Sequence, residues 1–206
     1  MAYMSWVTPQ KNGQTISGGN GNDTVSWVAQ VHTGRVLRDC YATFSASGVE
    51  SKTLHIIQSP TPEFVDVDDS ASINKTGGTI TISGWTNSTK LTFTLTGTNQ
   101  IGLTLPATYT ANGASTSNGA AIANDPGKDS KFQFSITFTN VAANTSITPK
   151  TSQLTVTDNA GNTDVCAITL AAGDAYLTIS PTEITIPADG TAQSVSVSSN
   201  TSWSIS

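Results

Sequence analysis

Apolar and polar residues alternate with a period of two along most of the chain. The longest run of this kind is residues 131–139, KFQFSITFT, in which every second side chain is apolar. Such alternation is the signal of a strand with one buried and one exposed face. Similar runs occur at residues 24–29, 79–82, 90–96, 153–157, 165–170, 183–186, 194–197 and 202–205. No segment shows the 3.6-residue period of an amphipathic helix, so the pattern predicts an all-β protein.

Turn residues separate these runs. Pairs such as Gly77-Gly78, Asn112-Gly113 and Asn118-Gly119 tolerate the positive φ angles that tight turns require. Many short strands joined by such turns are typical of β-sandwiches.

Two breaks divide the chain into three pieces. The SPTP sequence at 59–62 carries two prolines that cannot join a central strand, and the small residues at 171–175 precede a fresh strand. The piece 62–172 has the length of a complete immunoglobulin-like β-sandwich. The pieces 1–60 and 176–206 each look too short to close a core alone. Chains below about 40 residues rarely bury enough apolar surface, and the tail, with 31 residues, is below that limit.

The C-terminal piece carries a recognisable succession of motifs. Residues 177–187 read LTISPTEITIP, a turn follows at Asp189-Gly190, and residues 193–203 read QSVSVSSNTSW. This order resembles the first half of a BACON domain, the Bacteroidetes-associated carbohydrate-binding module, which is an immunoglobulin-like sandwich. The resemblance covers residues 177–203.

The N-terminal piece resembles the missing second half of the same module. Residues 5–9 begin it, residues 24–29 form a tryptophan-containing strand, and residues 38–44 and 52–58 resemble the closing strands. The resemblance therefore implies a second sandwich, split between the N- and C-termini in circularly permuted order. Such modules occur on surface enzymes of Bacteroidetes and on virions of their phages, including crAss-like Bacteroides phages, so either setting is implied.

Composition and charge argue against two classes of partner, nucleic acids and membranes. Only 11% of residues are charged, against roughly 25% in an ordinary domain, whereas the chain contains 34 threonines and 25 serines. With 9 basic residues and a net charge of −5, we expect no nucleic-acid partner. No apolar run approaches the roughly 20 residues of a membrane span, so we expect no membrane partner.

The first residues show neither the basic nor the apolar region of a secretory signal. Together with the adhesion-type composition, this favours a phage protein made in the bacterial cytoplasm and located in the virion. The alternative is a fragment of a secreted protein that has lost its signal, with an extracellular or cell-surface location.

Aromatic side chains are the candidates for sugar stacking. Trp85 follows a glycine near a turn and is the strongest candidate for an exposed platform, and Tyr109 is a weaker one. Trp6, Trp27 and Trp203 fall where the alternation of the family points inward, so we expect them in a core.

Catalytic chemistry is sparse. His32 and His55 lie near no nucleophile motif, no G-x-S-x-G occurs, and the glycines at 18–21 lack the lysine of a phosphate loop. We therefore expect no enzyme, no cofactor and no catalytic residues.

Two further groups of residues allow more than one interpretation. Cys40 and Cys166 are expected to be free, buried thiols, although their redox state stays open. Acidic and amide side chains either hold Ca²⁺ between domains or serve as solvated turn residues, with the second favoured, so we predict no metal site. These side chains are Asp66, Asp68, Asp69, Asp158, Asn159 and Asp164.

The leading hypothesis is a phage virion structural protein, either a capsid decoration (auxiliary) protein or a head-fibre subunit. Its partners would be other copies of itself, head to tail, and other virion proteins, with host or mucus glycans as further ligands. The alternative hypothesis is a carbohydrate-binding module of a secreted Bacteroidetes glycan-degrading protein.

The path of residues 176–206 discriminates between modes of assembly. A sandwich is roughly 40 Å long, whereas the linker at 171–175 spans only about 17 Å. We therefore expect the last piece to emerge far from its own N-terminal half and to complete that of a neighbour by donating strands. Closure within one chain is the alternative if both ends of the middle domain share one pole. The residues expected to be covered are Ile184, Ile186, Val195, Val197 and Trp203.

Overall fold

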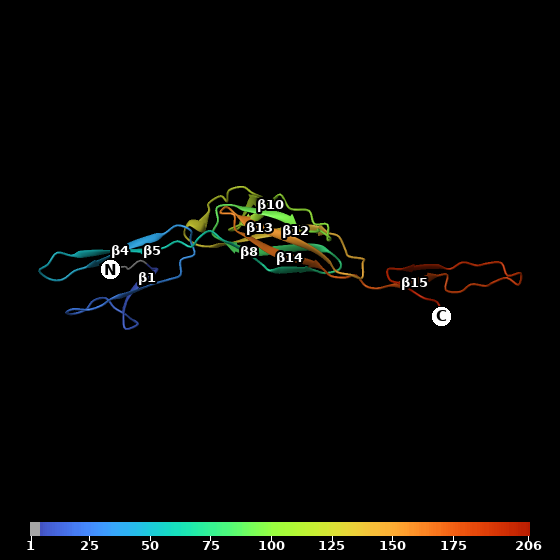
Figure 1. Ribbon diagram of the computed structural model, residues 1–206, viewed down its shortest axis with the longest axis horizontal. Helices are drawn as coiled ribbons and strands as arrows, with labels where there is room; N and C mark the ends of the chain where they lie inside the picture. The colour runs from blue at the N-terminus through green and yellow to red at the C-terminus, as the bar shows by residue number, and fades with distance from the viewer. Residues whose placement is uncertain (1–4) are drawn as a thin grey trace.

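The computed structural model describes residues 5–206 and consists almost entirely of strands, which confirms the all-β prediction (Figure 1). The only other regular element in this range is one turn of 3-10 helix, η1 (Pro126–Lys128). Three bodies follow one another along the long axis: an N-terminal part, a middle sandwich and a C-terminal tail. Within residues 5–206, no helix has the length and apolar character needed to cross a membrane.

The middle domain is a sandwich of two sheets. One sheet has five strands in the order β11-β10-β12-β8-β6, and the other has four in the order β7-β14-β13-β9. All neighbours are antiparallel except β7 and β14, which pair in parallel. The strands are β6 (Val65–Val67), β7 (Ser70–Ile73), β8 (Gly78–Thr86), β9 (Leu91–Thr96), β10 (Thr108–Ala111), β11 (Ala114–Ser117), β12 (Phe132–Val141), β13 (Lys150–Asp158) and β14 (Thr163–Leu170).

Local sequence explains these strands. The apolar positions of β12 are almost fully buried and alternate with exposed or half-buried polar ones, as the period of two predicts. The turn between β10 and β11 is Asn112-Gly113, and both residues have positive φ angles, 47° and 78°. This is the conformation that two-residue hairpins favour, because its twist matches that of the strands.

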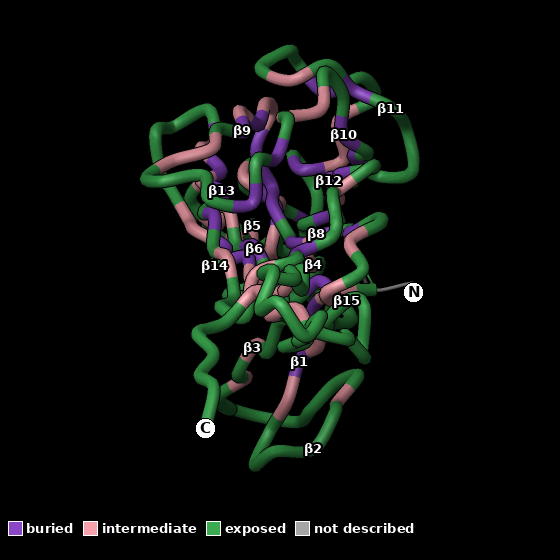
Figure 2. Tube along the Cα trace, turned by 90° about the vertical axis from the view of Figure 1, so that its right-hand side faces the viewer, coloured by how far each residue is buried: buried purple, intermediate pink, exposed green. Residues whose placement is uncertain are grey.

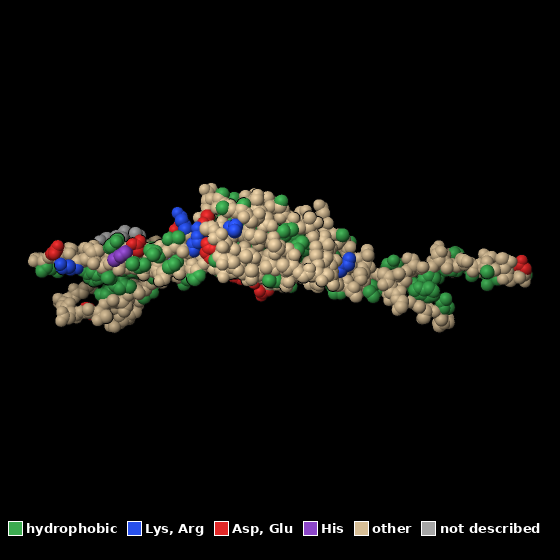
Figure 3. Space-filling model, turned by 45° about the horizontal axis from the view of Figure 1, so that its top comes forward, with side chains coloured by type: hydrophobic (Ala, Val, Ile, Leu, Met, Phe, Trp, Pro, Cys, Tyr) green, Lys and Arg blue, Asp and Glu red, His purple; other side chains and the backbone are tan. Residues whose placement is uncertain are grey.

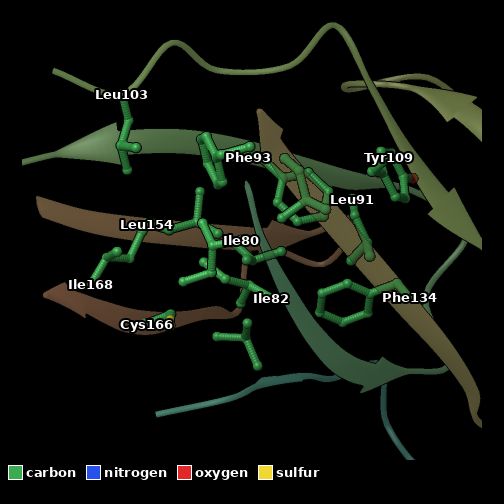
Figure 4. Close-up of a cluster of buried hydrophobic side chains, with 14 of the residues drawn as sticks. Ile80, Ile82, Leu91, Phe93, Leu103, Tyr109, Phe134, Leu154, Cys166 and Ile168 are labelled. Carbon is green, nitrogen blue, oxygen red and sulfur yellow. The ribbon is translucent and has the colours of Figure 1, made fainter. Parts of the chain in front are cut away.

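The core of the molecule lies between these two sheets. Phe93 and Phe134 meet edge to face with ring centroids 5.8 Å apart, and both are about 1% exposed. Gly84 leaves the space for this packing, because a Cβ there would lie 2.4 Å from the ring of Phe134. Figure 4 shows side chains from both sheets pointing into this cluster, among them Ile82 and Leu154.

The N-terminal part consists of two small sheets that face each other. One sheet has three strands in the order β2-β1-β3, and the other is the two-stranded hairpin β4-β5. In Figure 2 the buried colour gathers in the middle domain, while most of the terminal segments are exposed. The strands are β1 (Val7–Lys11), β2 (Gln14–Thr15), β3 (Ser26–Ala29), β4 (Arg38–Phe44) and β5 (Lys52–Gln58).

The tail is a two-stranded hairpin, β15 (Leu177–Ser180) with β16 (Ser196–Ser199), and none of residues 176–206 is buried. The predictions of strands at 183–186 and 202–205 are wrong for the single chain, where neither segment is in a strand. Alternation alone does not make a strand, because the backbone groups also need a neighbouring strand to bond with.

Candidate functional site

Exposed apolar side chains are concentrated at the two ends of the chain. Among the described residues, nine large apolar side chains are exposed in 5–60 and eight in 176–206. The middle domain, although longer than either, exposes only Trp85 and Ile147. Figure 3 shows hydrophobic side chains over both end pieces. Such concentrations mark surfaces that bind another molecule.

A groove of about 570 Å³ opens between the two small sheets of the N-terminal part. Trp27 of β3 and Phe44 of β4 meet there edge to face, with ring centroids 6.4 Å apart. The groove also has small and polar lining residues, including Gly18, Ala42 and Lys52. Its mixed lining suits a segment that carries both apolar and hydroxyl side chains.

The inner side chains of the β4-β5 hairpin are buried near Cys40 and become increasingly exposed toward Phe44. Cys40, Leu54 and Phe44 lie on one face of the β4-β5 hairpin, because Ala42 pairs with Leu54 and the strand alternates. Their exposed fractions rise along this face from 5% at Cys40 to 39% at Leu54 and 47% at Phe44. One face of the β4-β5 hairpin is therefore left partly uncovered.

The tail presents the complementary feature, an apolar face with nothing over it. Ile179 pairs with Val197 across the hairpin, which places both on one face. Of the residues expected to be covered, Val197 is half-buried, whereas the other four are exposed. Their exposed fractions are 41% for Ile184, 61% for Ile186, 38% for Val195 and 49% for Trp203.

A polar joint fixes the N-terminal part to the middle domain. The guanidinium of Arg35 forms a two-pronged ion pair with Asp125 and donates to the carbonyl of Asn87 at 2.7 Å. Asn87 is fully buried, and its Nδ2 donates to the carbonyls of Thr33, Thr61 and Pro62 within 3.3 Å. These contacts join three segments of the chain at one place.

A second joint fixes the tail at the opposite end of the sandwich. Asn200 Nδ2 donates to the carbonyls of Thr145 and Asp174, at 3.1 and 2.8 Å. Lys75 Nζ donates to the carboxylate of Asp174 at 2.5 Å, and Gly173 N donates to the carbonyl of Ser146 at 2.7 Å. The two joints hold the N-terminal groove and the tail at opposite ends of the molecule (Figure 1).

The two predicted glycan contacts have different environments. Trp85 is 42% exposed, and Lys131 Nζ lies 5.0 Å from the centre of its ring. The prediction for Tyr109 is wrong, because its side chain is only 3% exposed and packs 4.7 Å from the ring of Phe93. Tyr109 occupies an inward position of β10, where alternation places it in the core.

The other tryptophans belong to the two end pieces. Trp6 and Trp27 are half-buried, and Arg38 stacks 4.5 Å from the ring of Trp6. Trp203 was expected in a core but is exposed in the single chain, because the tail has no second layer to pack against.

Three of the acidic residues considered for calcium accept hydrogen bonds from backbone amides. Asp164 accepts from Val67 N at 2.8 Å, and Asp68 accepts from Ser83 N at 3.0 Å. Asp158 accepts from Asn162 N at 2.8 Å, which closes the β13-β14 turn. Within residues 5–206, no three carboxylate, imidazole or thiolate groups come together as a metal site.

The two cysteines are buried, whereas the two histidines have different environments. Cys40 and Cys166 are free and buried, as predicted. Burial and the nearby carboxylates raise the pKa of the Cys166 thiol to about 11. His55 is at the surface, where its ring stacks on that of Tyr41 and its Nε2 lies 2.6 Å from the carboxylate of Asp39. His32 is buried, and its Nε2 lies 2.6 Å from the carbonyl oxygen of Val36, a placement that no local pattern marks.

Comparisons with known proteins leave the function open. No family model matches the chain, and no curated protein matches it. Among solved structures, the chain is similar to an endo-fucoidan hydrolase of glycoside hydrolase family 107, with 11% identity and a TM-score of 0.29. The match covers 84% of this chain and 22% of that enzyme, so the chain spans less than a quarter of its length. A likeness this weak is not informative about fold or activity.

The joints have no clear local signal in the sequence. Arg35 and Asp125 are 90 positions apart, and nothing local marks them as a pair. The one available signal is Gly127, where a Cβ would lie 2.1 Å from the carbonyl oxygen of Asn87. A lone glycine in a loop does not reveal which distant segment approaches it.

Proposed function

We propose that this chain is a structural protein of a phage virion, an auxiliary capsid protein or a head-fibre subunit, that assembles through immunoglobulin-like modules. The observation that carries the proposal is the pair of incompletely covered apolar surfaces at opposite ends of a closed sandwich. A protein that stayed alone would leave these surfaces in water, at a cost proportional to their area.

The order of strands supports an immunoglobulin-like middle domain. If β6 and β7 are two halves of the first strand, the pairings β8-β12, β9-β13 and β13-β14 match the B-E, C-F and F-G pairings of that fold. The resemblance of residues 177–203 and 5–58 to two halves of a BACON module supports the virion setting.

The chemistry of the described residues favours a structural role over catalysis. The Nε2 atom of His55 contacts a carboxylate and that of His32 a main-chain carbonyl. In the part of the chain that the structure describes, neither imidazole is hydrogen-bonded to a hydroxyl or thiol nucleophile, which acyl transfer by a histidine base requires.

Mass spectrometry of purified phage particles tests the proposal. We expect peptides of this chain at a copy number comparable to that of other capsid-surface proteins, with matched lysate from uninfected cells as the control. Cryo-electron microscopy of the same particles would place the elongated sandwich on the head surface. Absence of the chain from washed particles would contradict a virion role.

A second candidate function is carbohydrate binding, and the exposed ring of Trp85 favours it. Aromatic faces stack on apolar sugar faces. The Lys131 ammonium lies over the Trp85 ring, 5.0 Å from its centre, so a stacked sugar would displace it or use the opposite face of the ring. Titration of soluble host glycans tests it: binding lost in Trp85→Ala and kept in Trp85→Phe supports a stacking platform. Equal binding by both variants would exclude Trp85 as the contact.

A further inference from the structure

We propose that residues 176–206 of one copy complete the N-terminal half-module, residues 5–58, of a second copy. The tail lays its apolar face over the groove between the two small sheets, and each copy donates at one end and accepts at the other. The inference rests on the proposed function and names the partner in that assembly.

Geometry excludes the tail of the same chain as the occupant. The groove and the tail lie at opposite ends of the sandwich (Figure 1), and the tail begins only a few residues after β14. The linker at 171–175 spans at most about 17 Å when extended, against roughly 40 Å for the sandwich. Asp174 and Asn200 hold the base of the tail in place.

The two surfaces are complementary in shape. The groove is lined by the exposed apolar side chains of Phe44 and Val49 and by the half-buried ring of Trp27, whereas the tail exposes eight large apolar side chains. The acceptor has a groove between two sheets, whereas the donor is a thin two-stranded hairpin with no layer of its own. An isolated hairpin of this kind is marginal in water, so covering it stabilises both partners.

Unpaired strand edges add directional bonding. Within the described residues, β3 ends the sheet β2-β1-β3, and the hairpins β4-β5 and β15-β16 have no further strand on either side. Exposed edges carry unsatisfied N–H and C=O groups that accept another strand. The tail therefore offers backbone hydrogen bonds as well as apolar contacts.

Charge is also complementary. Residues 176–206 contain Glu183 and Asp189 and no lysine or arginine, which gives the tail a net charge of −2. Residues 5–58 contain four basic and three acidic side chains, which gives the acceptor a net charge of +1. The pair attracts weakly, whereas two tails repel each other.

The contact is heterologous, because the surface that donates differs from the surface that accepts. Copies joined in this way close into a ring or extend into a filament. Either product forms in a concentration-dependent manner and carries one tail per groove.

Complementation between two full-length variants tests the exchange. The tail variant carries Ile184→Ser, Ile186→Ser and Trp203→Ser, and the groove variant carries Phe44→Glu and Leu54→Glu. All five positions are at least 39% exposed in the single chain, so the middle domain keeps its fold, which its thermal transition verifies. Ile147→Ser is the matched control, because Ile147 is as exposed as Ile184 and lies in the middle domain.

We expect wild type and Ile147→Ser to form oligomers in light scattering, and each of the two variants to stay monomeric. A one-to-one mixture of the variants should give a species of twice the monomer mass, because one intact groove meets one intact tail. Hydrogen exchange at residues 177–199 should slow at least about tenfold in this species.

Three results would overturn the exchange. These are oligomers of the tail variant alone, a mixture that stays monomeric although wild type assembles, and a wild type that stays monomeric up to about 0.1 mM, where a micromolar contact would be saturated. None of them removes the chain from phage particles, so particle mass spectrometry judges the proposed function separately. Conversely, complementation without presence in particles would keep the exchange and refute the virion role.

Discussion

The middle domain and the two end pieces share the same alternation of apolar and polar residues, yet their apolar side chains differ in how far they are buried. Phe134 in β12 is 1% exposed, whereas Phe44 in β4 is 47% exposed. Ile136 is 1% exposed, whereas Ile184 in the tail is 41% exposed. The alternation defines which face of a strand is apolar, but a second layer of the fold must cover that face.

The difference comes from the number of strands available. The middle domain has five strands in one sheet and four in the other, which is enough for two faces to cover each other. The tail has two strands, and the N-terminal part has five in two small sheets. The end pieces have too few strands to cover their own apolar faces, and a second copy would supply the missing layer.

Deletion of residues 176–206 should have the largest effect. We expect complete loss of self-association and increased protease sensitivity of residues 5–58, because the groove stays open. The unfolding transition of the middle domain should not change, because no tail residue is buried against it. Light scattering and limited proteolysis measure these outcomes, and a truncated chain that still assembles would contradict the comparison.

A matched pair of phenylalanine truncations compares the two regions directly. Phe134→Ala should lower the free energy of unfolding by about 3–5 kcal/mol, because it opens a cavity in a closed core. Phe44→Ala should cost less than about 1 kcal/mol in the monomer, where the ring is half in water. Chemical denaturation at low concentration measures both. Equal losses would show that the groove is already a closed core.

Arg35→Gln should weaken the joint between the regions. It removes the ion pair with Asp125 and the bond to Asn87, and leaves a half-buried carboxylate without its partner. We expect a loss of about 1.5–3 kcal/mol in unfolding free energy. Small-angle scattering should also show a wider distribution of end-to-end lengths.

Arg35→Lys is the control for charge at this joint. It keeps the positive charge but loses the two-pronged geometry, so an intermediate loss of stability is expected. If neither variant changes the scattering, other contacts determine the orientation of the N-terminal part.

The labelling rates of Cys40 and Cys166 measure local opening of the two regions with the smallest perturbation of the protein. Burial raises the pKa of both, to about 11 for Cys166, so at pH 8 both are protonated and react slowly. Cys40 lies in the part that opens more readily, and its labelling should be about tenfold faster or more than that of Cys166.

Labelling of both thiols should accelerate as pH rises toward their pKa values, because the thiolate is the reactive form. Cys40→Ser and Cys166→Ser assign each rate in a disulfide-exchange assay with a chromogenic reagent. In an assembled sample the Cys40 rate should fall, and the Cys166 rate should not. Similar rates for both thiols in the monomer would contradict the difference in closure.

Strand positions in the middle domain could be predicted from the sequence, because the two signals that define them, alternation and turn residues, are local. The alternation at 131–139 marks β12, and Asn112-Gly113 marks the turn between β10 and β11. The burial of Cys40 and Cys166 as free thiols also followed from residue type.

Tertiary structure alone decided what lies over each apolar face. Tyr109 entered the core, residues 183–186 stayed out of any sheet, and Arg35 found Asp125 from 90 positions away. The placement of the groove and the tail at opposite ends likewise depends on the whole sandwich between them. The physical reason is that alternation and turn chemistry act between near neighbours in sequence, whereas burial is a relation between segments that only the folded chain, or a second copy of it, brings together.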